Sequence, residues 1–411
     1  MANIKFTVKN KINSRCCKAR TGILELKHGA VNTPAFVPVA TKAAIKALTK
    51  DDLEELGIEI LMCNTYHLML KPGSKTIDEL GKLNRFMHWE KPVMTDSGGF
   101  QAFSLGYGME FTTGKLFFYE DDALGKKDIK NIKKNSGPKL AKITEEGIHF
   151  KSVYDGSRHF LSPEESMRIQ HELGSDIMFA FDECTSPLAT YNYTKESLAR
   201  THRWAERCII FHKKEKTGQA LFGIIQGGHY EDLRKEGTEF ICGLPFDGIA
   251  IGGSLGKSKK EMGEILDWIV PGIPGDRPIH LLGIGAVEDI FESVKRGIDL
   301  FDCVSPARLA RSGYVYILPK SGGSAKNKFR YRIKNAGFEK DTRPLDPECG
   351  CRMCRTYSRA YVNHLFRSDE YLAYTIATYH NLYFILDLMK EIRKAIDENR
   401  FEGLMGGWVG V

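Results

Sequence analysis

The chain has 411 residues, of which 42% are hydrophobic, 27% charged and 10% aromatic, and its 59 basic and 52 acidic residues give a net charge of +7. This composition suits a folded globular protein with a sizeable core, and it excludes the sparse apolar content and high net charge of disordered chains. No apolar run approaches the roughly 18 residues of a membrane helix, and the N-terminus lacks a secretory hydrophobic stretch. We therefore expect a cytoplasmic protein with no membrane association.

Short apolar or β-rich stretches recur along the chain, with helical segments between them. They lie at residues 31–40, 58–63, 92–95, 177–181, 220–225, 248–251, 279–283 and 298–301. Eight such units close most naturally into a (β/α)8 TIM barrel, an α/β fold, and an open doubly wound sheet is the alternative. Helix signals support the alternation, because Ser162-Pro163 forms an N-terminal cap and Thr49 begins a helix that Gly57 can end. We predict a single barrel domain over residues 1–411.

Polar residues or glycines follow most of these stretches. They are Asn64-Thr65, Asp96-Ser97-Gly98-Gly99, Asp182-Glu183, Gln226-Gly227-Gly228, Gly252-Gly253, Gly285 and Asp302. In a barrel these positions belong to the C-terminal face, where active sites of this architecture are found. A single Asp after a strand is more often a cap or turn residue, but three carboxylates together with several glycine turns favour an active site.

A lysine-rich stretch at residues 115–143 interrupts the alternation around the breaker Ser136-Gly137-Pro138. We expect an inserted basic surface loop here, because loops accept such insertions and the lysines need solvent. Phosphate binding by these lysines is the alternative.

A second basic stretch, from Cys303 to Phe338, contains no Asp or Glu. Its cations are Arg308, Arg311, Lys320, Lys326, Lys328, Arg330, Arg332 and Lys334, and Tyr314, Tyr316, Phe329 and Tyr331 are interleaved with them. Cations alternating with rings are expected where a protein meets phosphates and bases, whereas a solvated loop is the plain alternative.

Three of the ten cysteines lie within six residues, at Cys349, Cys351 and Cys354. In a chain without a signal peptide, such a cluster argues for metal ligation rather than for disulfides. A tight turn can direct three thiolates at one Zn²⁺, which then needs a fourth ligand.

The fourth ligand is predicted on the helix expected at residues 368–394, with Ser368 as its N-cap and Asp369 and Glu370 in its first turn. His380 lies on this helix. A lone helical His is ordinarily a core or surface residue, but three cysteines that lack a partner favour ligation. We expect one structural zinc per chain, because four protein ligands leave no open position.

Five motifs make the chain resemble the tRNA-guanine transglycosylases, also called queuine tRNA-ribosyltransferases, and most closely the bacterial type. The motifs are TDSGGFQ at 95–101, AFDECT at 180–185, FGIIQG at 222–227, GIDLFDCV at 297–304 and RPLDPE at 343–348. The resemblance covers nearly the whole chain. It implies a (β/α)8 barrel with a zinc-binding subdomain, here residues 339–395, whose ligands match Cys349, Cys351, Cys354 and His380.

Members of this family exchange a guanine at the anticodon wobble position of tRNA for a free 7-deazaguanine base without cutting the backbone. By resemblance, Asp302 is the nucleophile and Asp96 the general acid and base, roles that suit carboxyl groups at an anomeric carbon. The residues that match the base-binding positions are Ser97, Gly98, Gly99, Phe100, Asp182, Gln226 and Gly253.

Two segments match RNA-binding positions of the family. They are Gly283, Ile284, Gly285, Ala286, Val287, Glu288 and Asp289, and Ala307, Arg308, Leu309, Ala310 and Arg311. The implied partners are the tRNA anticodon loop, the free base and a second copy of the chain in a homodimer. Ala307 and Leu309 stand where many bacterial members carry Thr and Asn. The turn at 252–257 is one residue shorter than usual, which leaves open whether the incoming base is preQ1 or queuine.

Two other classes of function remain as alternatives. A non-catalytic RNA-binding subunit would not need Asp96, Asp182 and Asp302. A barrel glycosidase could use the same carboxylates on sugars, but the zinc site and the cationic stretch would then have no purpose.

Overall fold

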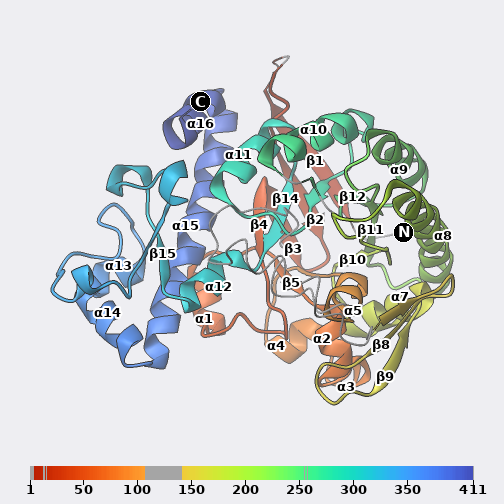
Figure 1. Cartoon of the computed structure of the whole chain (residues 1–411), viewed down its shortest axis with the longest axis horizontal. Helices are drawn as coiled ribbons and strands as arrows, with labels where there is room; N and C mark the ends of the chain where they lie inside the picture. The colour runs from red at the N-terminus through yellow and green to blue at the C-terminus, as the bar shows by residue number, and fades with distance from the viewer. Residues whose placement is uncertain are drawn as a thin grey trace. The chain divides into compact units, whose positions relative to one another are not determined.

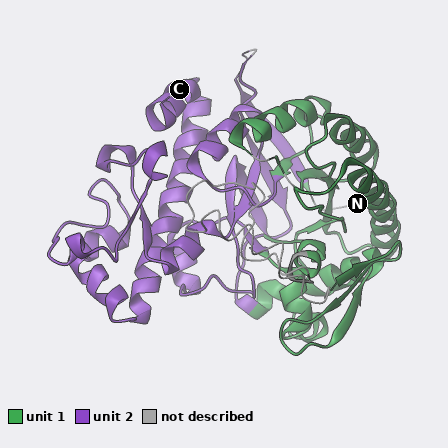
Figure 2. Ribbon diagram, in the orientation of Figure 1, with its two compact units in different colours: residues 1–4, 63–86, 93–280 green, residues 5–62, 87–92, 281–411 purple. Residues whose placement is uncertain are grey.

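The computed structural model describes residues 4–12, 14, 16–106, 141–253, 255–256 and 258–410. Two compact units interleave along the chain (Figure 2): unit 1 comprises residues 1–4, 63–86 and 93–280, and unit 2 comprises residues 5–62, 87–92 and 281–411. Residues 115–140 of the expected basic insertion lie outside the described residues. No helix in the described part of the chain is long and apolar enough to cross a bilayer.

Eight strands form one sheet in the order β4-β14-β13-β12-β11-β10-β6-β5 (Figure 1). They are β4 (Ala35–Pro38), β5 (Leu61–Cys63), β6 (Val93–Thr95), β10 (Ile177–Phe179), β11 (Ala220–Ile225), β12 (Gly248–Ile251), β13 (Ile279–Leu281) and β14 (Leu300–Cys303). A parallel bridge between Val39 and Met62 joins the two ends of this order. The predicted (β/α)8 barrel is confirmed, and each of its strands overlaps one of the eight predicted stretches.

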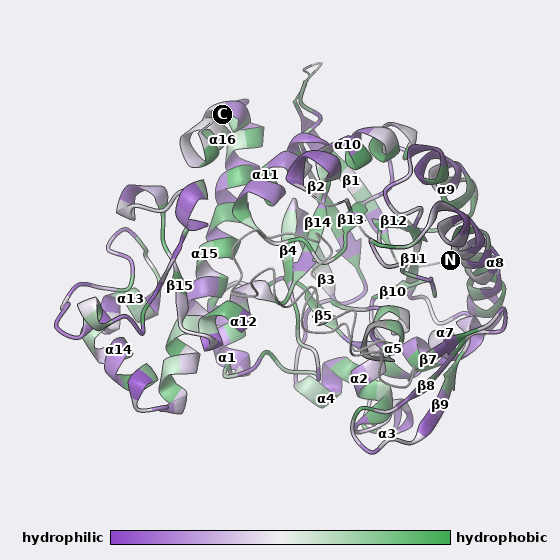
Figure 3. Cartoon of the chain, viewed as in Figure 1, coloured by the Kyte–Doolittle hydropathy of each residue, from purple (hydrophilic) through white to green (hydrophobic). Residues whose placement is uncertain are grey.

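Helices follow the strands of unit 1. They are α2 (Thr65–Leu70), α3 (Ser74–Glu79), α4 (Lys82–Met87), α5 (Gly99–Gly106), α7 (Pro163–Leu173), α8 (Tyr191–Glu215), α9 (Glu231–Gly243) and α10 (Lys259–Ile269), with a 3-10 turn η1 (Val270–Gly272). The predicted cap of α7 is confirmed, since the Ser162 hydroxyl accepts from the Glu165 N–H at 3.1 Å. In α8, which Figure 3 colours mostly hydrophilic, the buried residues Leu198, Ala205 and Cys208 recur at helical spacing.

A three-stranded antiparallel sheet of β1 (Lys5–Lys11), β2 (Arg20–Leu26) and β3 (Gly29–Thr33) lies in unit 2 and was not predicted. The strand expected at residues 31–40 divides at Pro34, because proline has no N–H to continue a ladder. The part before it pairs with β2, and the part after it joins β14 in the barrel sheet. A buried two-point ion pair between Arg20 and Asp299, at 2.6 and 2.9 Å, ties β2 to the segment that leads into β14.

The helices of unit 2 are α1 (Lys50–Glu55), α11 (Val287–Lys295), α12 (Ser305–Arg311), α13 (Arg352–Thr356), α14 (Arg359–Arg367), α15 (Tyr371–Asp397) and α16 (Phe401–Val409). The segment before α13 contains a pair of strands and three 3-10 turns. They are β15 (Tyr314–Tyr316), β16 (Arg330–Arg332), η2 (Pro319–Ser321), η3 (Ala325–Asn327) and η4 (Ala336–Phe338). The predicted start of α1 is confirmed, because the Thr49 N–H and the Asp52 carboxylate complete a capping box at 2.9 Å.

The predicted N-terminus of the long helix at 368–394 is wrong. Ser368 is the C-cap of α14, and the N–H groups of Ser368 and Glu370 donate back to the carbonyls of His364 and Leu365 at 3.0 Å. Asp369 adopts a left-handed conformation with φ 52° between the two helices. These polar residues therefore close α14, and α15 begins only at Tyr371.

A second antiparallel sheet, in unit 1, consists of β7 (Ala141–Ile143), β8 (Ile148–Lys151) and β9 (Arg158–Leu161). It follows α5 in the chain and precedes α7, so it belongs to the long connection after β6. The last three residues of the expected insertion, 141–143, are strand β7 of this sheet.

Candidate active site and metal centre

Asp96 directly follows β6 and is held from three directions. Its carboxylate accepts from the Asn64 side-chain amide, from the Thr65 backbone N–H at 2.8 Å and from the Gln101 side-chain amide at 2.8 Å. Asn64 and Thr65 follow β5, and Gln101 lies on the first turn of α5. Asp96 is half-buried. The carboxyl group is thus fixed in position by neighbouring strand ends yet remains accessible to a ligand.

A second carboxylate, Asp182, lies in a buried polar cluster of the same unit. The Ser97 hydroxyl donates to Asp182 Oδ1 at 3.0 Å, and the Gln226 amide donates to Oδ2 at 2.5 Å. Gln226 is 2% exposed, and its Oε1 has no hydrogen-bond partner within the described residues. A buried acceptor of this kind is costly unless a ligand or water satisfies it, so the cluster is suited to a ligand that presents N–H donors.

Glycines bring the backbone close to this polar cluster. A Cβ at Gly253, which has φ +77°, would lie 2.2 Å from Gln226 Oε1, and a Cβ at Gly99 would lie 2.9 Å from the Asp182 carbonyl oxygen. Any side chain at these two positions would therefore displace the cluster. Phe100, the next residue, is 39% exposed at the start of α5.

Arg234, a residue that the sequence did not single out, joins two of the strand ends. This fully buried α9 side chain donates from Nε to the Gly228 carbonyl at 2.7 Å, and from Nη1 to the carbonyls of Ile225 at 3.2 Å and Gly252 at 3.0 Å. Burial lowers its pKa to about 10. Because the peptide is planar, holding the Gly252 carbonyl toward Arg234 directs the Gly253 N–H the opposite way.

Glu183, the neighbour of Asp182, has different partners. Its carboxylate accepts from the Tyr193 hydroxyl at 2.7 Å and forms an ion pair with Arg200, both on α8. Glu183 is almost fully buried. Of the two adjacent carboxylates, Asp182 therefore lies in the polar cluster while Glu183 ties the strand-end loop to α8.

In unit 2, Asp302 lies near the C-terminal end of β14 and is half-buried. The backbone N–H of Gly283, which follows β13, donates to its Oδ1 at 3.0 Å. This hydrogen bond from a backbone amide fixes the orientation of the carboxylate. Next to it, burial raises the pKa of the Cys303 thiol, and a Cβ at Gly285 would lie 2.6 Å from the Cys303 Cβ. The glycines after β13 thus pack directly on the Asp302 segment.

The two predicted RNA-binding segments also lie in unit 2. Residues 283–286 lead into α11, whose first turn holds Val287, Glu288 and Asp289. Arg308 is exposed on α12, and Arg311, one turn later, is half-buried and donates to the Ala307 carbonyl at 2.9 Å. Burial and the neighbouring Arg308 lower the pKa of Arg311. The short α12 therefore presents two cations a few residues after Asp302.

The four predicted metal ligands come together in unit 2. The three Sγ atoms and the His380 Nδ1 all lie within 4.8 Å of one another, and all four residues are buried. From Nδ1, the sulfurs of Cys349, Cys351 and Cys354 lie at 3.7, 3.5 and 3.3 Å. Tetrahedral zinc with standard bond lengths implies sulfur–nitrogen separations of about 3.6 Å. The donor set and its spacing can therefore hold a metal ion.

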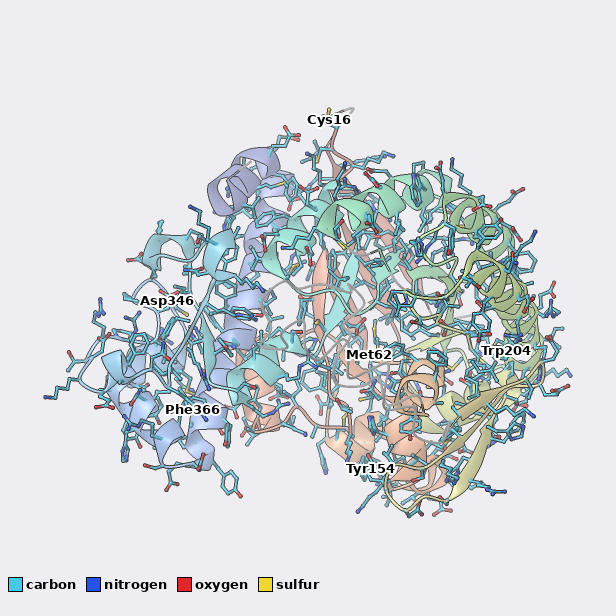
Figure 4. All side chains as sticks on the ribbon, viewed as in Figure 1. Cys16, Met62, Tyr154, Trp204, Asp346 and Phe366 are labelled. Atoms are coloured by element: carbon cyan, nitrogen blue, oxygen red, sulfur yellow. The ribbon has the colours of Figure 1, made fainter. Side chains whose placement is uncertain are left out.

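Neighbouring groups orient these ligands. The His380 Nε2 lies 2.8 Å from the Tyr316 carbonyl, so the ring donates there and directs the Nδ1 lone pair at the sulfurs. Asp346, labelled in Figure 4, is fully buried and accepts from the backbone N–H groups of Leu318 and Glu348 at 2.7 and 2.9 Å. These bonds shape the turn that delivers Cys349.

Comparison with known proteins gives one family across nearly the whole chain. The model of the family described as queuine tRNA-ribosyltransferase matches residues 16–409. The queuine tRNA-ribosyltransferase of Halothermothrix orenii is 47% identical over 399 residues, covering 97% of this chain and 95% of that protein. That of Roseiflexus sp. is 43% identical over 404 residues, covering 96% of both chains. A protein of Archaeoglobus fulgidus, provisionally given the same name, is 48% identical over 410 residues and 99% of each chain.

Proposed function

We propose that this chain, which belongs to the queuine tRNA-ribosyltransferase family of pentosyltransferases, exchanges guanine at the wobble position of tRNA for a free 7-deazaguanine base. The observation that carries this proposal is the buried cluster of Ser97, Asp182 and Gln226, whose acceptors suit the N–H donors on the edge of a guanine-like base. Phe100 and Gly253 would contact the same base. The competition experiment below decides whether the incoming 7-deazaguanine is preQ1 or queuine.

The chemistry assigned to the carboxylates balances over two steps. Asp302 attacks the anomeric carbon of the wobble nucleotide, the bond from that carbon to guanine breaks, and Asp96 gives a proton to the leaving base. The incoming base then loses a proton to Asp96 and attacks the same carbon, which breaks the glycosyl ester and frees Asp302. Two inversions retain the ribose configuration. The fixed positions of both carboxylates support these roles, because each is oriented by backbone N–H donors.

The ion held by the cysteines and His380 is proposed to be one structural zinc per chain. Its support is the Cys3His donor set with its second layer of hydrogen bonds, and four protein ligands leave no position for substrate. The expected homodimer, the single-domain boundaries and the cytoplasmic location stay predictions.

Transfer of radiolabelled guanine into tRNA tests the exchange most simply. We expect label in intact tRNA with the wild-type protein. A non-catalytic RNA-binding subunit would give no incorporation, and a glycosidase would release sugar instead, so either result would reject the proposal. Competition of preQ1 and queuine against the labelled guanine then shows which base is used.

Arg308 and Arg311 are predicted to contribute more to tRNA use than the lysines of the basic insertion. Arg308→Ala or Arg311→Ala should raise the KM for tRNA strongly and flatten its salt dependence, because phosphate contacts release counterions and α12 follows the nucleophile within nine residues. Deletion of residues 126–134 should have a smaller effect. Steady-state kinetics over a salt series measure both. A deletion that does more damage than the arginine changes would mean that the anticodon loop lies elsewhere.

Replacing Arg234 with Met is predicted to disturb base recognition as well as stability. The substitution keeps the volume but removes the Arg234 donor from three buried carbonyl groups. The Ile225 carbonyl still accepts from the Gly252 N–H, so the loss falls on the Gly228 and Gly252 carbonyls, at about 1–3 kcal/mol each before relaxation. Since the Gly252-Gly253 peptide is then no longer held, the KM for guanine should rise more than the KM for tRNA. Chemical denaturation and the two KM values check this, and equal changes in both KM values would reduce Arg234 to a purely structural residue.

A further inference from the structure

The β7-β8-β9 sheet of unit 1 has an inward face and an outward face, which its register separates cleanly. Ala141 lies opposite Phe150, Ile143 opposite Ile148, and Ile148 opposite Leu161. These residues are buried, apart from the half-buried Ile143. Because directly paired residues point to the same side of a sheet, they define its inward face.

The outward positions are Lys142, His149, Lys151, Arg158 and Phe160, which we name the sheet face. Lys142 lies opposite His149, His149 opposite Phe160, and Lys151 opposite Arg158. All five residues are exposed. The sheet face therefore presents three permanent cations, an imidazole and a benzene ring, with no carboxylate among its five positions.

The aromatic pair on the sheet face distinguishes it from an ordinary solvated surface. Phe160 is 41% exposed, and its ring centroid lies 4.4 Å from that of His149 with an interplanar angle of 34°. Edge lysines alone are a common protection against strand pairing, but that purpose does not call for an exposed phenylalanine. Exposed rings between cations are the pattern that binds unpaired nucleotides, with bases on the rings and phosphates on the cations.

The carboxylates in the two turns of this sheet are already engaged. Asp155, between β8 and β9, accepts from the Ser157 hydroxyl at 2.7 Å and from its N–H at 3.1 Å. Glu145, between β7 and β8, forms a two-point ion pair with Arg203 of α8 at 2.6 and 2.8 Å. The third carboxylate, Glu146, follows Glu145 and is hydrogen-bonded by the Thr144 side chain of the same turn. These contacts direct none of the three carboxylates at the cations of the sheet face.

The inward face attaches the sheet to the elements that hold Asp96. The Phe150 ring lies 5.3 Å from that of Tyr66 on α2, directly after the Thr65 that binds Asp96. A Cβ at Gly98 would touch Leu161 at 3.4 Å, and α5 packs against β8. Tyr154, which is labelled in Figure 4, lies in the turn between β8 and β9. Its hydroxyl oxygen is 2.9 Å from Nδ1 of His67 on α2. The sheet is thus attached directly to α2 and α5, the two helices that contribute the Thr65 and Gln101 contacts of Asp96.

We propose that the sheet face is a second contact surface for the substrate tRNA. Phe160 and His149 stack an unpaired base next to the target nucleotide, and Lys142, Lys151 and Arg158 contact the phosphates around it. The proposal rests on the proposed function, since tRNA is the RNA brought to Asp96. It adds to the predicted contacts of Arg308 and Arg311, which belong to the other unit.

The test compares two double variants of the full chain that each lose two exposed cations of unit 1. Lys151→Ala with Arg158→Ala removes them from the sheet face, and Lys213→Ala with Lys214→Ala removes them from the end of α8. In filter binding of tRNA over a salt series, the first variant should bind more weakly and lose about 1–2 from the slope of log affinity against log salt. The α8 variant should behave nearly as wild type. Equal behaviour of the two variants would overturn the proposal.

Phe160 separates stacking from charge. Phe160→Ala should weaken tRNA binding about tenfold and raise the KM for tRNA, with the KM for guanine unchanged, whereas Phe160→Tyr keeps the ring and the affinity. Unchanged tRNA binding by Phe160→Ala would overturn the proposal. A shift of this variant from dimer to monomer in sedimentation would also overturn it, because the sheet face would then be a contact between copies of the chain. If the wild type binds tRNA in this way but incorporates no guanine, the proposed function fails while the RNA contact stands.

Discussion

Replacing Asp302 with Asn is expected to abolish both base exchange and covalent capture of tRNA while leaving the fold intact. An amide oxygen is a poor nucleophile at a sugar carbon, so exchange should fall by several orders of magnitude. The amide oxygen can still accept the Gly283 N–H that now binds Oδ1, so the free energy of unfolding should change by only about 1 kcal/mol. Denaturing gels of protein incubated with tRNA and substrate base detect the adduct.

A matched control for this change is Asp299→Asn, three residues earlier in the same segment. Asp299 is buried in an ion pair with Arg20, so its loss should lower stability while the protein that remains folded still forms the adduct. A persisting protein–RNA adduct in the Asp302 variant would remove that residue from the nucleophile role.

Removing the metal is expected to have the second large effect, on stability rather than on chemistry. Cys351→Ser or His380→Ala should abolish binding of one zinc per chain and lower the free energy of unfolding by several kcal/mol, because metal binding to a site formed only in the folded state is folding free energy. Any chain that stays folded should retain most of its kcat. Elemental analysis and thermal unfolding measure the two effects.

Cys16→Ser serves as the control, since Cys16 is an exposed cysteine outside the cluster and should change neither zinc content nor melting. Full activity with unchanged melting in a metal-free preparation would contradict the structural role of the metal.

The barrel strands were the most predictable part of the fold. β11 and β12 have the expected bounds, since each is a continuous buried apolar run that ends in a Gln-Gly or Gly-Gly turn. The N-terminal sheet escaped prediction because β1 is mostly exposed and polar, and its register comes from pairing with β2 nine residues later. The misplaced start of α15 has a local cause, because Ser368 suits an N-cap as well as the C-cap position that tertiary packing gave it.

The site was predictable where a residue type carries the chemistry. The cysteines and His380 gather as their spacing indicated, and Asp182 meets Ser97 and Gln226 although more than forty positions separate Asp182 from Gln226. Arg234 was missed because its partners are backbone carbonyls, which leave no pattern in the side-chain sequence. The sheet face was missed for a similar reason, since only the strand register shows that Lys142, His149 and Phe160 lie side by side.

Nucleoside analysis by mass spectrometry of tRNA incubated with the protein and free preQ1 or queuine tests the proposed base exchange directly. The wobble guanosine should be replaced by the corresponding 7-deazaguanosine in full-length tRNA, with one guanine released for each base incorporated, and Asp302→Asn should give neither product. Unchanged tRNA with both bases, or cleavage of the RNA chain, would contradict it.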